Sequence, residues 1–313
     1  MLLKVKEIKM QETTRSRNSF VTIVGRPNVG KSSLLNALIG EKIAAVSAKP
    51  QTTRTKITGV LTKGDTQYVF MDTPGMHTAK NKLSEHMINA VNESVSDIDV
   101  LLLVTDVSKK VSDTEKKLAA SAGNNTKKVL ILNKIDLISD KAELMNKIIE
   151  YSSLCSFDDV IPISVRDNDG LDIVLQAIDK YAVEGPHYFP DDMLTDQPEK
   201  VIMAEIIREK ALNNLNEEIP HGIAVTIESL NERDSKSGEP ILDIEATVFC
   251  ERESHKRIVI GSKGSMLKKI GSDAREELEG FFEIKVNLNL WVKVKEGWRN
   301  REGMIRNFGL SDK

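Results

Sequence analysis

The sequence has few cysteines, no apolar run long enough to cross a membrane and no excess of basic residues. Its two cysteines, Cys155 and Cys250, lie far apart and match no metal-ligand spacing, which favours free thiols in a reducing compartment. The apolar run 100–104 has only the length of a strand, and the polar residues 1–18 contain no signal-peptide core. A cytoplasmic protein is therefore expected.

The charge balance also limits the possible partners. A net charge of −3 and an isoelectric point near 6.1 give no general attraction to nucleic acid. Any such function would need a local basic patch. The 313 residues, 40% of them hydrophobic, are enough for two domains with cores of their own.

Apolar strand-like runs alternate with helical patterns through residues 19–184. This alternation predicts a doubly wound α/β domain with a mostly parallel sheet, whose ligands bind at the carboxyl ends of the strands. The expected strands are 20–24, 57–62, 66–71, 100–106, 128–132 and 160–163. The expected helices are 31–39, 81–95, 112–123, 140–153 and 171–183.

Residues 185–200 are rich in proline and acidic residues and are typical of a linker. Residues 201–300 predict a second, α+β domain. Its expected elements are helix 201–219, strands 222–230 and 241–252, helices 255–260 and 265–279, and strand 283–294. Residues 1–18 and 301–313 are expected to be tails outside both domains.

Residues 25–32, Gly-Arg-Pro-Asn-Val-Gly-Lys-Ser, form a phosphate-loop motif between the first expected strand and helix. Backbone N–H groups of such a loop surround the phosphates, Lys31 reaches the β- and γ-phosphates, and the Ser32 hydroxyl can bind Mg²⁺. The expected nucleotide contacts here are Gly25, Arg26, Pro27, Asn28, Val29, Gly30, Lys31, Ser32 and Ser33. The loop indicates a nucleoside triphosphate but leaves the base open.

Two further segments are expected at the γ-phosphate. Asp72 can hold Mg²⁺ through a water, and the Gly75 N–H can sense the phosphate. A threonine of the Gln-Thr-Thr-Arg segment at 51–54 can complete the Mg²⁺ shell, and Thr53 is favoured over Thr52. This adds Asp72, Thr73, Pro74, Gly75 and Met76 to the nucleotide contacts and makes Lys31, Thr53, Gly75 and Asn28 the expected catalytic residues.

The segment Asn133-Lys134-Ile135-Asp136 follows the fifth strand and favours guanine. The Asp136 carboxylate can accept hydrogen bonds from guanine N1–H and N2–H₂, a pair that adenine lacks. The stem of Lys134 can cover one face of the ring. Ser164 and Val165, after the sixth strand, can offer a backbone N–H to guanine O6.

The order and spacing of these motifs resemble the GTPases of the Ras and translation-factor type, which implies hydrolysis of GTP to GDP and phosphate with Mg²⁺. Met76 stands where Ras-like proteins carry the glutamine that orients the attacking water. This departure narrows the resemblance to bacterial hydrophobic-substituted GTPases, several of which use K⁺ held by an asparagine of the phosphate loop. Asn28 is in that place and either binds K⁺ or stabilises the loop. His77 is expected to be a solvated turn residue and not a base.

The second domain contains Gly261-Ser262-Lys263-Gly264 between two expected helices, in a locally basic stretch. Glycines allow close approach of a nucleic-acid backbone, and a helix N-terminus favours a phosphate. The segment looks like a type II KH domain, whose groove holds unpaired nucleotides. The expected RNA contacts are Lys256, Arg257, Ile260, Gly261, Ser262, Lys263, Gly264, Lys268 and Lys269. Trp291 and Trp298 are expected to pack in the core, with stacking on RNA bases as the less favoured alternative.

A GTPase followed by a KH domain resembles the Era family of ribosome-assembly GTPases. The resemblance extends to Gln-Thr-Thr-Arg at 51–54, Ile-Ile-Arg-Glu-Lys at 206–210 and Leu-Trp-Val-Lys-Val-Lys at 290–295. It implies a monomer that binds GTP and GDP, the 3′ end of 16S rRNA and the 30S subunit, with peripheral contact to the inner membrane. Val165 departs from the family's usual alanine. Loops near Thr53 and Gly75 are expected to couple the nucleotide to domain docking, which would expose or cover the groove at 261–264.

Two alternatives stay open at this point. One is a membrane-associated cell-cycle GTPase whose basic second domain binds acidic lipid. The other is an RNA-binding module with a degenerate nucleotide site, which would not turn over GTP.

Overall fold

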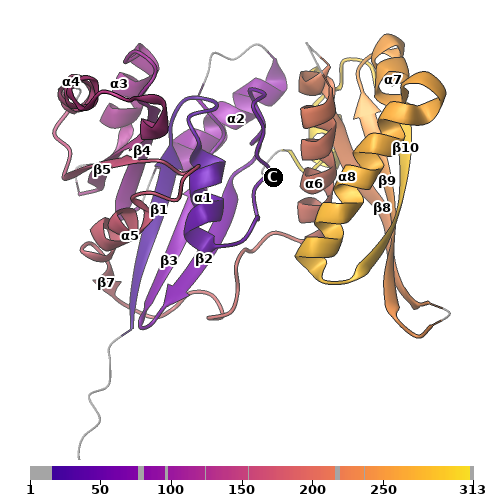
Figure 1. Ribbon diagram of the computed structural model, residues 1–313, viewed down its shortest axis with the longest axis horizontal. Helices are drawn as coiled ribbons and strands as arrows, with labels where there is room; N and C mark the ends of the chain where they lie inside the picture. Colours follow the sequence, from indigo (N-terminus) through magenta and orange to yellow (C-terminus); the bar gives the residue numbers. More distant parts are fainter. Residues whose placement is uncertain are drawn as a thin grey trace, which may run out of the picture.

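The computed structural model describes residues 16–76, 81–95, 98–123, 125–153, 155–215, 219–235 and 237–310. Figure 1 shows two domains side by side, joined by a segment that runs beneath them. The N-terminal domain is a sheet covered by helices on both faces, and the second domain is a smaller sheet with its helices on one face. The fold classes expected from the sequence are confirmed.

The sheet of the first domain has the strand order β2-β3-β1-β4-β5-β6, with β7 paired antiparallel to β1. Only β2 runs antiparallel to its neighbour within that order. The strands are β1 (Arg17–Val24), β2 (Ile57–Lys63), β3 (Thr66–Asp72), β4 (Val100–Asp106), β5 (Lys127–Asn133), β6 (Asp159–Ile163) and β7 (Val183–Glu184). Every residue of β4 is buried, as in a central strand covered on both faces.

Two layers of helices cover this sheet. Helices α1 and α5 pack on one face, while α2, α3 and α4 pack on the other. Their bounds are α1 (Lys31–Ile39), α2 (Lys82–Glu93), α3 (Asp113–Ser121), α4 (Lys141–Ser152) and α5 (Leu171–Asp179). Because β1 leads into α1 on one face and the adjacent β4 leads into α3 on the other, the chain directions diverge there. This leaves the crevice in which such folds bind ligands.

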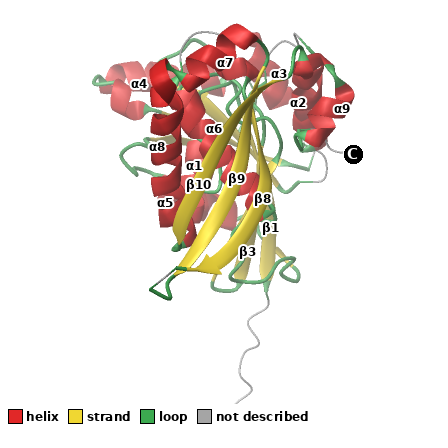
Figure 2. Cartoon of the chain, turned by 90° about the vertical axis from the view of Figure 1, so that its right-hand side faces the viewer, coloured by secondary structure: helices red, strands yellow, loops and turns green. Residues whose placement is uncertain are grey.

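The second domain has the element order helix, strand, strand, helix, helix, strand of the type II KH fold. Strand β9 lies between β8, which is antiparallel to it, and β10, which is parallel. The elements are α6 (Glu199–Asn214), β8 (Ala224–Asp234), β9 (Pro240–Cys250), α7 (Glu253–Ile260), α8 (Ser265–Phe282) and β10 (Lys285–Val294). All three helices pack on one face of the sheet; Figure 2 looks onto the opposite face.

The expected C-terminal tail is wrong for residues 301–310. Helix α9 (Glu302–Asn307) follows the last strand, and Ile305 and Leu310 are buried beside Trp298. The same cluster includes Leu83 and Met87 of α2, so this segment belongs to the contact between the two domains. A single six-residue helix gives too short a periodic pattern to be recognised in the sequence.

The boundaries of the N-terminal tail and the linker also differ from expectation in detail. Strand β1 already begins at Arg17, inside the expected tail 1–18. The linker is bonded along β2 and β3: Val60 N donates to the Leu194 carbonyl at 2.8 Å, and Gln67 Oε1 accepts from the Tyr188 and Phe189 N–H groups. The linker is therefore held against the first domain over much of its length. Within the described ranges, no helix combines the length and apolarity needed to cross a membrane.

Candidate nucleotide site and RNA interface

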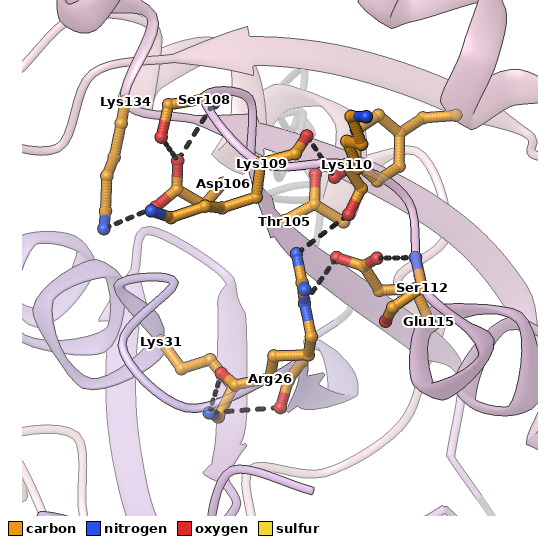
Figure 3. Close-up of polar contacts among 12 residues, drawn as sticks. Arg26, Lys31, Thr105, Asp106, Ser108, Lys109, Lys110, Ser112, Glu115 and Lys134 are labelled. Carbon is orange, nitrogen blue, oxygen red and sulfur yellow. Dashed lines mark hydrogen bonds and ion pairs between the residues drawn. The ribbon is translucent and has the colours of Figure 1, made fainter. Parts of the chain in front are cut away.

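The phosphate loop connects β1 to α1. Gly30 precedes α1 in the left-handed region, with φ 103°. The Lys31 amine turns back into the loop and donates to the carbonyls of Gly25 (3.4 Å) and Arg26 (3.2 Å), as Figure 3 shows. Burial lowers the pKa of Lys31, although the charge of Asp72 opposes this shift. An ammonium group held in this way is placed to meet phosphate oxygens.

Arg26 of the same loop is fixed by α3. Its Nε donates to Glu115 Oε1 at 3.1 Å, and its Nη2 donates to the Lys110 carbonyl at 3.3 Å (Figure 3). Glu115 is fully buried and also accepts from the Ser112 N–H in the capping box of α3. The sequence placed Arg26 at the nucleotide, whereas the structure directs its side chain to α3. Glu115 was missed because its partner lies 89 residues away.

Three oxygen-bearing side chains expected at Mg²⁺ converge. Ser32 Oγ lies 2.5 Å from Asp72 Oδ2 and 2.7 Å from Thr53 Oγ1, and all three residues are buried. Thr52 instead directs its hydroxyl to Ser47 Oγ and the Lys49 carbonyl. The geometry therefore favours Thr53 as the threonine of this site.

This oxygen cluster fits a hard divalent cation. Burial raises the pKa of Asp72 to about 6, against the lowering effect of Lys31. Asp72 Oδ1 is buried and has no hydrogen-bond partner in the described part of the chain. A bound Mg²⁺ would offset the cost of a buried carboxylate, and carboxylate and hydroxyl oxygens are ligands that it prefers.

The segment after β3 closes onto the phosphate loop. Met76 N donates to the Gly25 carbonyl at 3.2 Å, and a side chain at Gly75 would come within 2.7 Å of the Pro27 backbone. Thr73 Oγ1 donates to the Ile23 carbonyl at 2.8 Å, which anchors the segment to β1. The Met76 side chain packs against the apolar cluster that includes Val24. His77 lies outside the described residues.

The expected base-recognition residues surround the other end of the loop. Asn133 Nδ2 donates to the Val29 carbonyl at 2.8 Å, and Asn133 Oδ1 accepts from the Val165 N–H at 3.2 Å. Lys134 adopts a left-handed conformation and donates to the Asn28 carbonyl (2.7 Å) and to Asp106 Oδ2 (2.8 Å). Asp106, at the end of β4, is a further site residue that the sequence analysis did not identify.

Asp136 has partners on both of its carboxylate oxygens. Ser164 Oγ donates to Oδ1 at 2.7 Å, and Arg166 Nη1 lies 3.0 Å from Oδ2. The Asp136 side chain is 7% exposed, whereas that of Arg166 is 66% exposed. Because the carboxylate is buried, it needs a partner at all times, and the N1–H and N2–H₂ groups of guanine can replace the exposed Arg166 there when the base binds. Asn28 Nδ2 donates to the Ala48 carbonyl at 2.7 Å, which joins the phosphate loop to the segment before Thr53.

In the second domain, a groove of about 390 Å³ separates α8 from β10. Gly264 stands at its end with φ 81°, and no atom lies within 4 Å of where a side chain would begin. Of the RNA contacts expected from the sequence, Gly264 and Lys268 line this groove. The residues that the sequence analysis missed there are Leu267, Gly271, Ser272, Arg275, Val286, Asn287, Leu288, Asn289 and Leu290.

The remaining expected RNA contacts surround the turn between α7 and α8. Lys263, at the tip with φ 51°, Lys268 and Lys269 are exposed, and none of them forms an ion pair with a described residue. Lys256 lies 3.8 Å from Glu253. The remaining expected residues are Arg257, Ile260, Gly261 and Ser262, all at the end of α7 or in the turn.

The prediction for the two tryptophans holds for Trp298 and is wrong for Trp291. Trp298 is fully buried and donates from Nε1 to the Gly222 carbonyl at 2.9 Å. Trp291 is 60% exposed on the open face of the sheet, where its Nε1 donates to Glu245. Side chains alternate along β10, which places Trp291 opposite the face that packs on α8.

The fold and the ordered motifs define a P-loop GTPase fused to a type II KH domain. The family model described as a 50S ribosome-binding GTPase matches residues 20–134, and a KH domain model matches residues 218–299. GTPase Era of Clostridioides difficile strain 630 is 48% identical over 95% of this chain and 99% of its own length. GTPase Era of Ruminiclostridium cellulolyticum is 47% identical over 94% and 97%.

Solved structures agree over 95% of the chain. A crystal structure of Era in complex with MgGDPNP and nucleotides 1506–1542 of 16S ribosomal RNA matches with a TM-score of 0.90 and 36% identity, covering 95% of this chain and 100% of that chain. An Aquifex aeolicus Era variant bound to GDP and AlF₄⁻ matches with a TM-score of 0.89 at 36% identity. This chain belongs to the Era family of GTPases, as the sequence resemblance predicted.

Proposed function

We propose that this GTPase binds the 3′ end of 16S rRNA through its KH groove and assists assembly and maturation of the 30S subunit. The observation that carries this proposal is the groove between α8 and β10, which is bordered by Gly264 and by exposed lysines. A narrow groove with a glycine turn suits a single-stranded backbone, and cations beside it attract phosphates. The similarity to an Era–rRNA complex over 95% of the chain supports the choice of RNA.

In the nucleotide site, we assign one role to each group. The phosphate-loop backbone and Lys31 bind the phosphates, and Ser32, Thr53 and Asp72 hold Mg²⁺. The cation supplies charge neutralisation at the β- and γ-phosphates when it is bound. Asp136 recognises guanine after Arg166 moves aside, and Lys134 covers the ring.

Hydrolysis is expected to be slow in the absence of a partner. The Met76 side chain packs against an apolar cluster and offers only a thioether, which has no donor and is a weak acceptor, so it cannot orient water as a glutamine does. Its backbone N–H instead donates to Gly25. We infer that a K⁺ ion compensates at Asn28. The Ala48 carbonyl, which accepts from Asn28 Nδ2, and Asn28 Oδ1, once the amide has rotated, would offer it two oxygen ligands at the edge of the phosphate loop. Stimulation of GTP turnover by K⁺ over Na⁺, lost in Asn28→Ser, would support this role.

A direct test of the RNA function is crosslinking in cells followed by sequencing of the bound RNA fragments. Enrichment of the 3′ end of 16S rRNA, lost when Lys263, Lys268 and Lys269 are replaced by methionine, is the expected result. The alternative is a membrane-associated GTPase that uses the same lysines on anionic lipid. It predicts binding to vesicles containing phosphatidylserine with no preference for single-stranded RNA. If the protein binds both the rRNA and the vesicles, the RNA function stands, and the protein is a cytoplasmic one that also makes peripheral contact with the inner membrane.

A further inference from the structure

The loop between α1 and β2, residues 40–56, is held by the second domain. This segment, called here the switch loop, carries Thr53 at the oxygen cluster with Ser32 and Asp72. Four of its residues, Lys42, Val46, Thr52 and Arg54, bond to α6 or to the turn before β8, which belong to the KH domain. The Ile-Ile-Arg-Glu-Lys segment at 206–210, which has no role in either binding site, supplies the partners of the first three.

Glu209 holds the first half of the switch loop. Its Oε2 accepts from the Val46 N–H at 2.8 Å, and its Oε1 accepts from Lys42 Nζ at 2.6 Å. Glu209 is only 3% exposed. A buried carboxylate favours keeping both donors in place, because displacing the loop would leave the Val46 N–H without its acceptor and would separate the carboxylate from the Lys42 ammonium.

Arg208 holds the second half of the loop. Its Nη2 donates to the carbonyl of Thr52, while Glu205 grips the guanidinium from α6, with Nε to Oε1 at 2.7 Å. The Thr52 carbonyl and the Thr53 N–H belong to one planar peptide unit. Arg208 therefore sets the orientation of the peptide from which Thr53 projects.

Arg54 anchors the other side of Thr53. It is 3% exposed and donates to the carbonyls of Ile223 (2.6 Å) and His221 (3.0 Å), with its guanidinium 5.6 Å from the centre of the Trp298 ring. Contacts to the KH domain thus bracket Thr53 on both sides. Arginine side chains are rarely this buried. Arg54 of the switch loop and Arg208 of α6 both donate across the contact between the domains, so these two bonds exist only in the docked state.

We propose that Arg208 and Glu209 are positioning residues for Thr53, so that the docked KH domain completes the Mg²⁺ site of the GTPase domain. The proposal rests on the role of Thr53 given under the proposed function. Displacement of α6 would release the Thr52 carbonyl and the Val46 N–H together, and Thr53 would lose its support. Since Thr53 serves the triphosphate state, docking would favour GTP over GDP, and by reciprocity GTP would favour docking by the same factor.

Equilibrium binding of fluorescent GDP and of a fluorescent non-hydrolysable GTP analogue, both with Mg²⁺, tests the proposal. Arg208→Met is expected to weaken the analogue about tenfold and to change GDP affinity less than about twofold. Thr53→Ala should produce the same selective loss. The double variant should bind the analogue no more weakly than the more weakly binding of the two single variants, because both changes remove the same interaction of Thr53. Arg233→Met, which removes an exposed arginine pair with Asp243 on the open sheet face, is the matched control.

Equal losses for GDP and the analogue would show a merely structural effect and overturn the proposal, as would no loss or an additive double variant. Unchanged near-ultraviolet circular dichroism establishes that the fold is intact. If Arg208→Met fails this check, Glu209→Gln, which keeps the shape and removes the charge, carries the same comparison. RNA binding is measured separately with an oligonucleotide of the 16S rRNA 3′ end. A selective loss of affinity for the analogue in the variant, together with no RNA binding by the wild-type protein, would refute the RNA function and leave the positioning role standing.

Discussion

In the nucleotide site the polar side chains already bind one another, whereas the groove of the KH domain presents exposed cations to solvent. Ser32 and Lys134 each bond to other groups of their site. Lys263 and Lys268 form no ion pair with any described residue. A nucleotide has a fixed shape and binds best to a preorganised pocket. An RNA strand is attracted by the electrostatic field of the exposed lysines and is held along its phosphate backbone. The two sites should therefore respond to different kinds of change.

The largest expected effect is the loss of guanine recognition at Asp136. Asp136→Asn removes the paired acceptor for guanine N1–H and N2–H₂, two charge-assisted hydrogen bonds worth about 1.5–3 kcal/mol each. GDP affinity should fall by about a hundredfold or more, and xanthosine diphosphate should become the preferred ligand. Competition between the two nucleotides measures the ratio.

The control for Asp136 is Asp140→Asn, which changes the N-cap of α4 and preserves a capping side chain. It should leave the preference for guanine intact. A retained preference for GDP in Asp136→Asn would show that Ser164 and Val165, and not the carboxylate, select the base.

The second change affects neither site directly but acts on the contact between the domains. Ile305→Ala truncates a fully buried side chain in the cluster that joins α9, Trp298 and α2, which should lower the free energy of unfolding by about 2–4 kcal/mol. Denaturant unfolding monitored by fluorescence measures this loss. Ile149→Ala, at a position 64% exposed on α4, should cost much less.

This variant also separates the two sites. GDP contacts lie outside the cluster, so GDP affinity should be unchanged, and none of the residues that line the groove belongs to the cluster. Weaker RNA binding by Ile305→Ala would contradict the view that the groove recognises RNA independently of docking.

Sequence patterns predicted most of this fold because strands and helices of the first domain are regular and local. Strand β4 and helix α1 match their predicted ranges. The phosphate loop and Asp72 were predicted to meet because both follow parallel strands. The preference for Thr53 over Thr52 agrees with the geometry, although its role as a ligand stays a prediction.

The features that were missed depend on contacts between distant segments. Arg26 was placed at the nucleotide because of its position in the loop, but Glu115 draws its side chain to α3. Trp291 is a different kind of miss. Its apolar ring favoured the core, although alternation along β10 places it on the face of Asn287, Asn289 and Lys293, opposite the valines and leucines. Arg208 and Glu209 left only an unexplained motif, because their partners lie 156 and 163 residues away. The periodicity of a short sequence window cannot reveal contacts between residues so far apart in the chain.

The third change tests the open groove. Replacing Lys268 and Lys269 together by methionine should weaken binding of single-stranded RNA about tenfold at low salt. The slope of log affinity against log salt should fall by about 1.4, since each phosphate contact contributes about 0.7. Filter binding across a salt series measures both quantities.

Lys285→Met is the control for the groove, because Lys285 is an exposed lysine of the same domain already paired with Glu239. Lys285→Met should leave the salt slope unchanged. Neither this variant nor the Lys268 and Lys269 variant should alter GDP affinity. An unchanged slope in the Lys268 and Lys269 variant would mean that these lysines do not face the RNA.

The smallest expected effect concerns the linker at 185–200, which connects the GTPase domain to the KH domain. His187 Nδ1 lies 2.6 Å from Asp191 Oδ1, and His187 Nε2 lies 3.2 Å from the Asp65 carbonyl. Asp191 first, and then the Asp65 carbonyl, raise the pKa of His187 in the folded protein. Protonation therefore favours the folded state. Its contribution is complete below the unfolded pKa of about 6.5 and disappears as the pH rises through the higher folded value.

Because the His187 contact is near the surface and screened, the melting temperature of wild type should exceed that of His187→Gln by only about 1 °C at pH 5.5 and by nothing above pH 8. Asp191→Asn should remove the same pH dependence, since it removes the partner that dominates the shift. RNA affinity should show no difference between wild type and His187→Gln at either pH, because the groove draws none of its charge from the linker. A pH-dependent loss of RNA binding in His187→Gln would show that linker attachment and groove are coupled, and the contrast between a preorganised nucleotide site and an independent, open groove would fail.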